Sequence, residues 1–126
     1  MHELSLAQHL LALALERAHQ SGAQRVVGLH LAVGELALLE EASLSFYWEH
    51  VSQATPAAGS VVHVRRLPLN MVCLDCGRSF RPGGETWACP DCRSERVRLQ
   101  GGDESFLEAI DVETASGSQA QPWPNA

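Results

Sequence analysis

Four cysteines are the residues whose type and spacing most clearly predict chemistry. Cys73, Cys76, Cys89 and Cys92 form two C-x-x-C pairs with twelve residues between the pairs. A two-residue gap lets both sulfurs of a pair turn toward one point, so two pairs can supply four thiolates to a tetrahedral Zn²⁺. Four thiolates fill the coordination shell, and we therefore expect a structural zinc. A redox dithiol or a disulfide pair is the weaker interpretation, because neither pair has the strand-then-helix setting of redox motifs.

The first three residues form a second candidate metal site. Met1, His2 and Glu3 directly precede a helical pattern. A histidine in second place puts the terminal amine, its own amide and its ring nitrogen within reach of one ion, and the Glu3 amide can complete a square of nitrogens. Such planar nitrogen sets favour Ni²⁺ or Cu²⁺ over Zn²⁺. We expect these residues to bind a transferable metal ion, Ni²⁺ or Cu²⁺; a solvated side chain is the ordinary alternative for a histidine near a terminus.

The remaining histidines and the known catalytic motifs predict no further site. The other five histidines, at positions 9, 19, 30, 50 and 63, share no ligand spacing, and we expect them on the surface or at strand edges. His2-Glu3 resembles the start of H-E-x-x-H, but position 6 is Leu. Neither G-x-S-x-G nor a phosphate loop occurs, so the sequence encodes neither hydrolase nor nucleotidase chemistry.

Composition narrows the class of protein. The 126 residues are 45% hydrophobic, which suits one domain, or one domain with a small satellite. The net charge is −6, which disfavours non-specific binding to nucleic-acid phosphates. No apolar run approaches the ~18 residues of a membrane span, and the cysteine pairs suit a reducing compartment. We expect a cytoplasmic protein with neither nucleic acid nor membrane as a partner.

The hydrophobic pattern predicts an α+β fold, a three-stranded mixed sheet packed with two helices plus an inserted small zinc-ribbon-like domain. The expected helices are 4–20 and 39–53, and the expected strands are 25–34, 60–69 and 104–113. The expected domains are an α/β body that carries the candidate N-terminal metal site (1–69 plus 101–113), a zinc-binding domain inserted between strands (70–100) and a disordered tail (114–126).

These features together resemble a known family. The start MHELSL, the stretch VVGLHLAVGEL, the paired C-x-x-C motifs and the segment GGDESFLEAIDVE are similar to the HypA/HybF hydrogenase nickel-incorporation proteins, over roughly residues 1–113. The resemblance implies a metallochaperone that delivers Ni²⁺ to the large-subunit precursor of [NiFe]-hydrogenase. It places the family's nickel motif on Met1, His2 and Glu3, its zinc ligands on the four cysteines, and a further acidic residue near nickel on Glu40.

The resemblance also implies partners. One is a nickel-handling GTPase, which would hydrolyse GTP because this chain lacks a phosphate loop. Urease is a possible second target, and a homodimer is a possible assembly. One alternative stays open at this point: a zinc-ribbon adaptor that binds a protein or nucleic acid and has no nickel role.

Overall fold

The computed structural model describes residues 2–83 and 86–122. The elements in chain order are α1 (Glu3–Gln20), β1 (Arg25–Gly34), α2 (Glu41–Val51), β2 (Val61–Leu67), β3 (Asn70–Cys73), β4 (Ser79–Phe80), β5 (Val97–Gly101), β6 (Ser105–Thr114) and β7 (Gly117–Pro122). Five of them, the two helices and the strands β1, β2 and β6, correspond within a few residues to the elements expected from the sequence.

The chain divides into two compact units. The helix unit contains Met1–Ala32, Leu38–Arg65 and Phe106–Ala126, and the cysteine unit contains Val33–Ala37 and Arg66–Ser105. The sequence analysis placed the insertion at 70–100, whereas this division begins it at 66, ends it at 105 and adds Val33–Ala37, which starts with the last two residues of β1. Backbone hydrogen bonds explain the addition, because the Glu35 amide donates to the Leu67 carbonyl at 2.9 Å and the Leu36 amide to the Gly102 carbonyl at 2.9 Å.

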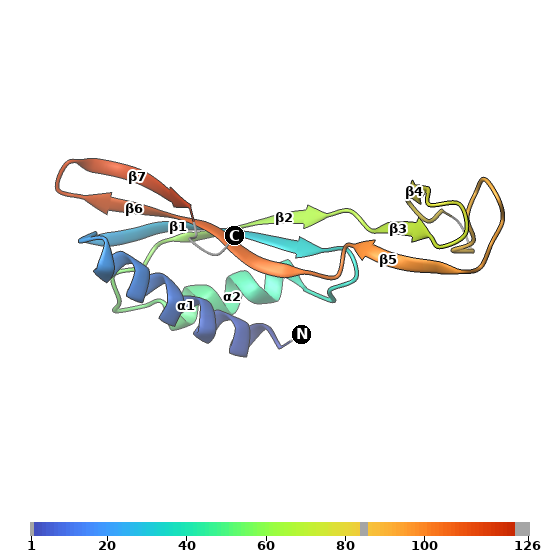
Figure 1. Cartoon of the computed structure of the whole chain (residues 1–126). Helices are drawn as coiled ribbons and strands as arrows, with labels where there is room; N and C mark the ends of the chain where they lie inside the picture. The colour runs from blue at the N-terminus through green and yellow to red at the C-terminus, as the bar shows by residue number, and fades with distance from the viewer. Residues whose placement is uncertain (1, 84–85, 123–126) are drawn as a thin grey trace. The chain divides into compact units, whose positions relative to one another are not determined.

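The helix unit contains a four-stranded sheet in the order β2-β1-β6-β7. In Figure 1 the arrows of β1 and β2 point the same way and that of β6 points the opposite way, so the sheet is mixed. Helix α2 connects the two parallel strands, as a crossover between parallel neighbours requires. The predicted mixed sheet is therefore correct in character, but the prediction of three strands is wrong.

The fourth strand comes from the segment predicted to be a disordered tail. β7 pairs antiparallel with β6, from Thr114↔Gly117 to Ala109↔Pro122. The Thr114 hydroxyl donates to the Gly117 carbonyl at 3.1 Å and closes the turn between them. Small and polar residues suit an exposed edge strand as well as a linker, and that ambiguity misled the prediction. The disorder prediction is wrong for 117–122, and its last residues, 123–126, lie outside the described residues.

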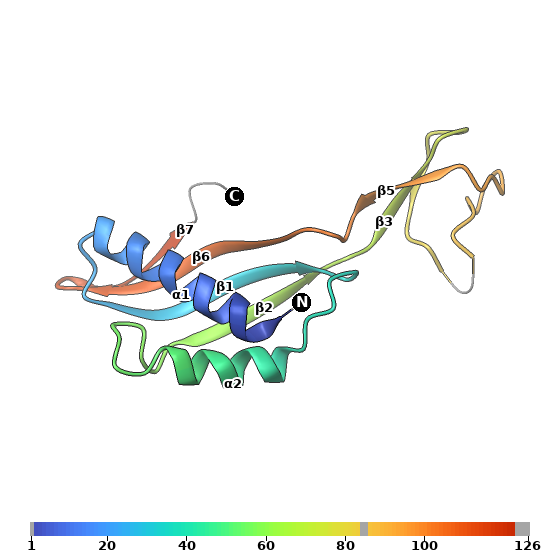
Figure 2. The same ribbon diagram turned by 90° about the horizontal axis from the view of Figure 1, so that it is seen from below.

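Both helices cover one face of this sheet, and no helix among the described residues covers the other (Figures 1 and 2). α1 and α2 also pack against each other. The buried helical residues are Ala7, Leu10, Ala14, Ala18, Leu44 and Trp48. The indole nitrogen of Trp48 donates to the Ser60 hydroxyl at 2.9 Å, so this buried ring keeps its polar atom satisfied.

The cysteine unit has a small core of its own. Its sheet has the order β4-β3-β5. The buried cluster consists of Met71, Cys73, Phe80 and Cys89, with Val97 and Leu99 packed against it. So few apolar side chains supply little hydrophobic free energy, and a second source of stability is expected in a unit of this size.

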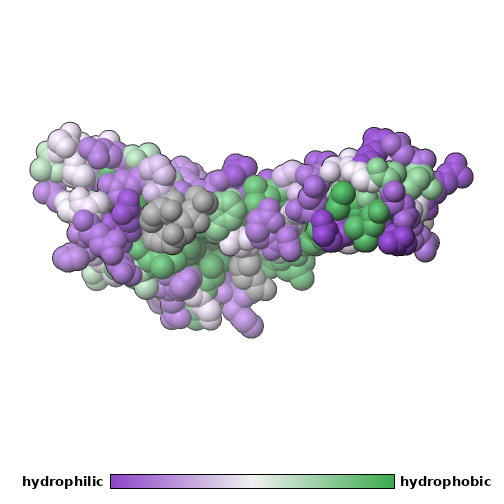
Figure 3. Space-filling view, viewed as in Figure 1, coloured by the Kyte–Doolittle hydropathy of each residue, from purple (hydrophilic) through white to green (hydrophobic). Residues whose placement is uncertain are grey.

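Neither described helix has the length and apolar character that crossing a bilayer demands. Large hydrophobic side chains do reach the surface, and these are Leu4, Leu36, Leu38, Phe46, Val61, Leu74, Trp87 and Phe106. On the face seen in Figure 3, hydrophobic residues emerge in small groups between hydrophilic ones.

Candidate metal centres

The sulfur atoms of the four cysteines converge on one point. All four lie within 4.8 Å of one another. The Cys73 and Cys92 sulfurs are 3.5 Å apart, and those of Cys76 and Cys89 are 3.6 Å apart. Four sulfurs at ~2.3 Å from a tetrahedral Zn²⁺ are separated by about 3.8 Å, so these residues fit that ion. All four are free thiols.

The two C-x-x-C turns with the residue that follows each, 73–77 and 89–93, are called knuckles here and share one backbone geometry. The Gly77 amide donates to the Cys73 carbonyl at 2.9 Å, and the Arg93 amide donates to the Cys89 carbonyl at 2.9 Å. Gly77 has φ +79° and Arg93 has φ +59°. The second knuckle therefore places an arginine in a left-handed conformation that ordinarily favours glycine.

The pKa values of the four thiols differ: those of Cys73 and Cys89 are lowered, and those of Cys76 and Cys92 are raised. The backbone amide of Cys76, above all, lowers the pKa of the Cys73 thiol to about 7. At Cys92 the Ser94 amide favours the thiolate, but the hydrogen bond to Cys73 and desolvation outweigh it and raise the pKa to about 12. Four adjacent thiols resist joint ionisation because the negative charges repel one another, so a full thiolate set calls for a cation among them.

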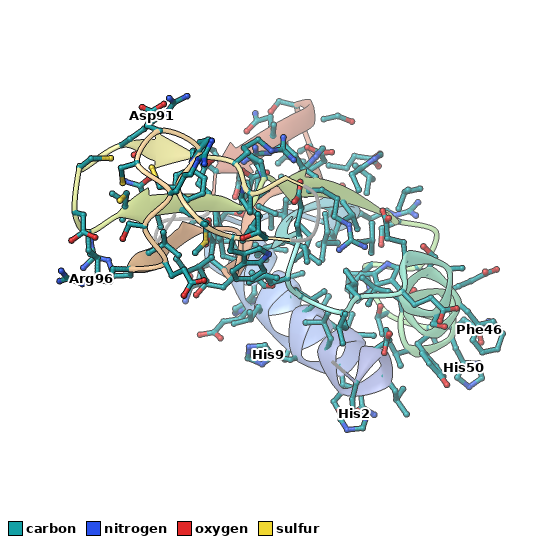
Figure 4. The ribbon with its side chains drawn as sticks, turned by 90° about the vertical axis from the view of Figure 1, so that its right-hand side faces the viewer. His2, His9, Phe46, His50, Asp91 and Arg96 are labelled. Carbon is teal, nitrogen blue, oxygen red and sulfur yellow. The ribbon has the colours of Figure 1, made fainter. Side chains whose placement is uncertain are left out.

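Ion pairs link the two knuckles from outside. Asp75, inside the first pair, accepts a hydrogen bond from Arg96 at 2.7 Å. Asp91, inside the second pair, accepts one from Arg78, which follows the first pair. Figure 4 labels Asp91 and Arg96 on this part of the chain. The aspartate of each knuckle thus pairs with an arginine that follows the other knuckle. These two ion pairs hold the knuckles in place relative to each other.

The predicted nickel residues lie at the start of α1. His2 is the N-cap residue, with extended backbone, and its exposed side chain makes no capping hydrogen bond to the described residues. Its carbonyl accepts the first helical bond, from the Leu6 amide at 2.9 Å. Figure 4 shows the His2 ring at the helix end and His9 farther along the same helix. Met1, the third predicted residue, lies outside the described residues.

Glu3 connects the beginnings of the two helices. Its Oε1 atom accepts a hydrogen bond from the backbone amide of Glu40 at 3.2 Å. Glu40 is the N-cap of α2, and Glu41 is in the first turn of that helix. The sequence analysis matched Glu40 to an acidic residue that lies near nickel in the family. This residue thus lies beside the first turn of α1, although 37 positions separate it from Glu3.

A third group of potential ligands, which sequence reasoning missed, lies on the sheet. Donor atoms of His30, His63 and Asp111 lie within 4.8 Å of one another. His63 is exposed and His30 is partly exposed, as the sequence analysis expected, but their spacing along the chain gave no sign that they lie together. They escaped notice because they come from different strands. The alternation in 25–34, which places His30 among small residues on one face, was the available signal.

Comparisons with known proteins agree with this arrangement. Residues 1–112 match the family model described as "Hydrogenase/urease nickel incorporation, metallochaperone, hypA". A hydrogenase maturation factor HypA of Dehalococcoides mccartyi (strain CBDB1) is 35% identical over 118 residues, covering 94% of this chain and 99% of that protein. A hydrogenase maturation factor HybF of Morganella morganii is 35% identical over 113 residues, covering 90% and 100%.

The fold is also similar to a solved one. The solution structure of the Ni metallochaperone HypA from Helicobacter pylori matches with a TM-score of 0.63 at 22% identity, covering 90% of this chain and 99% of that chain. The adaptor alternative is not favoured, because the match includes both the first residues and the cysteine segment. The family is one of metal carriers and not of enzymes. With 1–112 matched, this chain belongs to the HypA family of hydrogenase/urease nickel-incorporation metallochaperones.

Proposed function

We propose that this chain binds Ni²⁺ at its amino terminus and delivers it during maturation of [NiFe]-hydrogenase. The Met1 amine, the His2 amide and ring nitrogens and the Glu3 amide bind the nickel, which is cargo. Cys73, Cys76, Cys89 and Cys92 bind a structural Zn²⁺, which stays in the chain when nickel is delivered.

The contact between Glu3 and Glu40 is the observation that supports this site most strongly. The first amides of a helix have no acceptor within the helix, so the Glu3 nitrogen is available to a metal. The partial positive charge at a helix N-terminus opposes cation binding. The Glu3 carboxylate, one residue after the exposed His2, offsets that charge, and the acidic residues Glu40 and Glu41 begin the helix that Glu3 contacts. The balance favours moderate affinity, which suits a carrier that must release its ion.

Zinc has a structural task in this proposal. The cysteine unit buries only a small apolar cluster. Binding of structural zinc supplies about 10–16 kcal/mol in small zinc peptides, which exceeds what that cluster can contribute. Four thiolates leave no open position on the ion, so zinc neither catalyses nor travels with the cargo.

Hydrogenase maturation also defines partners and a place. The chain encodes no phosphate loop, so any GTP hydrolysis that accompanies nickel insertion occurs in a partner GTPase. The recipient is the precursor of the hydrogenase large subunit, with urease as a second recipient. Both encounters take place in the cytoplasm, without nucleic acid or membrane, and a homodimer is compatible with them.

Blocking the terminal amine tests the proposal. Zinc-loaded chain with a native start is compared with the same chain extended by two residues before Met1, and with His2→Ala. Isothermal titration should show that each change removes one equivalent of nickel bound by the native chain, while each variant retains its zinc. His9→Ala, an exposed substitution on the same helix, is the control and should bind nickel normally. Equal nickel stoichiometry and affinity in the native and extended chains would refute this site.

A further inference from the structure

The helix-free face of the sheet brings together three side chains from three strands. His63 of β2, His30 of β1 and Asp111 of β6 lie on neighbouring strands. Successive residues of a strand point to opposite faces. His30 lies between the buried Leu29 and Leu31, and Asp111 lies between the buried Ile110 and Val112. Both therefore point away from the face that the helices cover.

The contacts within this group are close. The Nε2 atom of His30 and the Oδ2 atom of Asp111 are 2.7 Å apart. The rings of His30 and His63 stack with centroids 4.8 Å apart and an interplanar angle of 14°. The side chains of His30 and Asp111 are 39% and 30% exposed, so an ion from solvent can reach them.

Gly28 makes room for the carboxylate. A Cβ atom at this position would lie 2.7 Å from the Oδ2 atom of Asp111. Gly28 and His30 are two residues apart on β1 and share a face, so the Asp111 side chain extends over the gap that the glycine leaves beside the imidazole. This placement aims the carboxylate at His30.

The charges around the group favour a cation. Arg65, two residues after His63 and on the same face, is paired with Glu108. That pairing offsets the charge of the Arg65 guanidinium, which therefore opposes a cation at the two imidazoles and the Asp111 carboxylate less than an unpaired arginine would.

We infer that His30, His63 and Asp111 form an additional binding site for a divalent transition-metal ion, separate from both the amino terminus and the four cysteines. Imidazole and carboxylate together suit borderline ions such as Ni²⁺ and Zn²⁺, whereas Mg²⁺ and Ca²⁺ require oxygen donors. Ligand bonds of ~2.0–2.2 Å separate tetrahedral donors by about 3.4 Å. The donors already lie within 4.8 Å, so rotation of the exposed His63 ring and a small opening of the other pair complete the site.

Three protein donors leave at least one coordination position to water. An ion bound in this way exchanges readily, unlike one enclosed by four thiolates. The site is therefore suited to hold a metal ion transiently on the surface of the carrier. It does not depend on nickel binding at the amino terminus.

The test uses the full zinc-loaded chain carrying His2→Ala and the two-residue extension, so that the terminal site is absent. Ni²⁺, Zn²⁺ and, as a control, Mg²⁺ are titrated by calorimetry, and histidine ring signals are followed by NMR. One equivalent of Ni²⁺ should bind and broaden the His30 and His63 ring signals, Zn²⁺ should bind as well, and Mg²⁺ should have no effect.

Two variants identify the ligands. His63→Ala removes an exposed donor and should weaken binding at least about tenfold, since even outer-shell changes cost that much. Asp111→Asn keeps the shape and the hydrogen bond to His30 and should weaken binding as well. His19→Ala, exposed at the end of α1, should change nothing.

Absence of Ni²⁺ binding to the terminally blocked chain, or equal affinity after His63→Ala, would overturn the inference. The two proposals fail separately. If only the native chain binds nickel, the sheet site is wrong and the carrier function stands. If native and blocked chains bind the same single equivalent through His63, the sheet site is right and the terminal site is wrong.

Discussion

The Glu3 carboxylate accepts a hydrogen bond from the backbone amide of Glu40 at 3.2 Å. The first residue of α1 is thereby held against the residue that precedes α2. Because Glu40 contributes its backbone, the contact depends on the Glu3 side chain and not on the identity of residue 40. It orients the segment on which His2 lies, and with it the proposed nickel ligands.

Substitutions at Glu3 should separate this positioning role from the charge. Glu3→Gln keeps an acceptor for the Glu40 amide but loses the negative charge, so it should leave the unfolding free energy nearly unchanged and weaken nickel binding several-fold. Glu3→Ala loses both and should also destabilise the chain by about 1 kcal/mol, as for a typical hydrogen bond. Calorimetric titration and denaturant unfolding measure the two effects. Identical nickel affinities for the two variants and the native chain would contradict the electrostatic argument.

The left-handed residues of the two knuckles should respond to substitution in opposite directions. Gly77→Ala should destabilise the cysteine unit by about 1 kcal/mol through backbone conformation alone, since a Cβ at Gly77 would meet no described heavy atom within 4 Å. Arg93→Gly should stabilise it by about 0.5–1 kcal/mol, because relief of a ~1–2 kcal/mol left-handed strain exceeds the entropic cost of glycine.

Zinc release during guanidinium unfolding, followed with a chromogenic chelator, measures both knuckle variants. Each serves as the control for the other, because both leave all four cysteines in place. A loss of stability in Arg93→Gly equal to that in Gly77→Ala would show that left-handed strain is not what distinguishes the knuckles.

The ion pair between Arg65 and Glu108 predicts a pH dependence. The hydrogen bond from Arg65 holds the pKa of Glu108 below its usual value, so the unfolded chain binds this proton more tightly than the folded chain. The pair therefore stabilises the fold above the ordinary glutamate pKa of ~4.3, and this contribution is lost as the pH falls through the lower folded value.

Glu108→Gln should accordingly be less stable than the native chain near neutral pH, and the difference should vanish in acid. Denaturant unfolding at a series of pH values, followed by the NMR signal of the buried Trp48 indole, measures it. Glu49→Gln, an exposed change on α2, is the matched control. A difference that persists unchanged in acid would show that charge pairing is not its source.

The strand β7 should be dispensable for metal binding. The family match ends at residue 112, and all but one of the β7 residues are exposed. Its backbone hydrogen bonds to β6 are largely offset by the entropy of ordering the segment. A chain ending at Thr114 should keep its zinc and its nickel affinity and lose less than about 2 kcal/mol of stability. Loss of nickel binding after this truncation would assign β7 a role beyond the sheet edge.

Sequence periodicity predicted the helices and strands best where one face of the element is buried and the hydrophobic residues must therefore repeat regularly. The strand 25–34 was expected with the bounds that β1 has, because alternate residues pack against helices. In α1 the first apolar residue, Leu4, is 41% exposed. Leu4 lies in the first turn, at the end of the helix, where packing from neighbouring elements is incomplete. The exposed β7 carries no hydrophobic alternation, so its composition could not distinguish a strand from a linker.

Local spacing determined how much of each candidate site could be predicted. The cysteine cluster followed from its own motif because each C-x-x-C pair is a local structure. The group of His30, His63 and Asp111 depends on strand order, since 81 positions separate His30 from Asp111. The sequence of one strand does not show which strands lie beside it, so this group could not be predicted. The contact of Glu3 with Glu40 arises in the same way, from the packing of two helices.

X-ray absorption at the nickel edge tests the central claim most directly. The sample is zinc-loaded chain with a native amino terminus, one equivalent of Ni²⁺ and His63→Ala, so that the sheet site does not contribute. The account predicts nickel surrounded by nitrogen and oxygen, with imidazole scattering that His2→Ala removes. A nickel shell composed of sulfur would place the cargo on the cysteines and contradict the account.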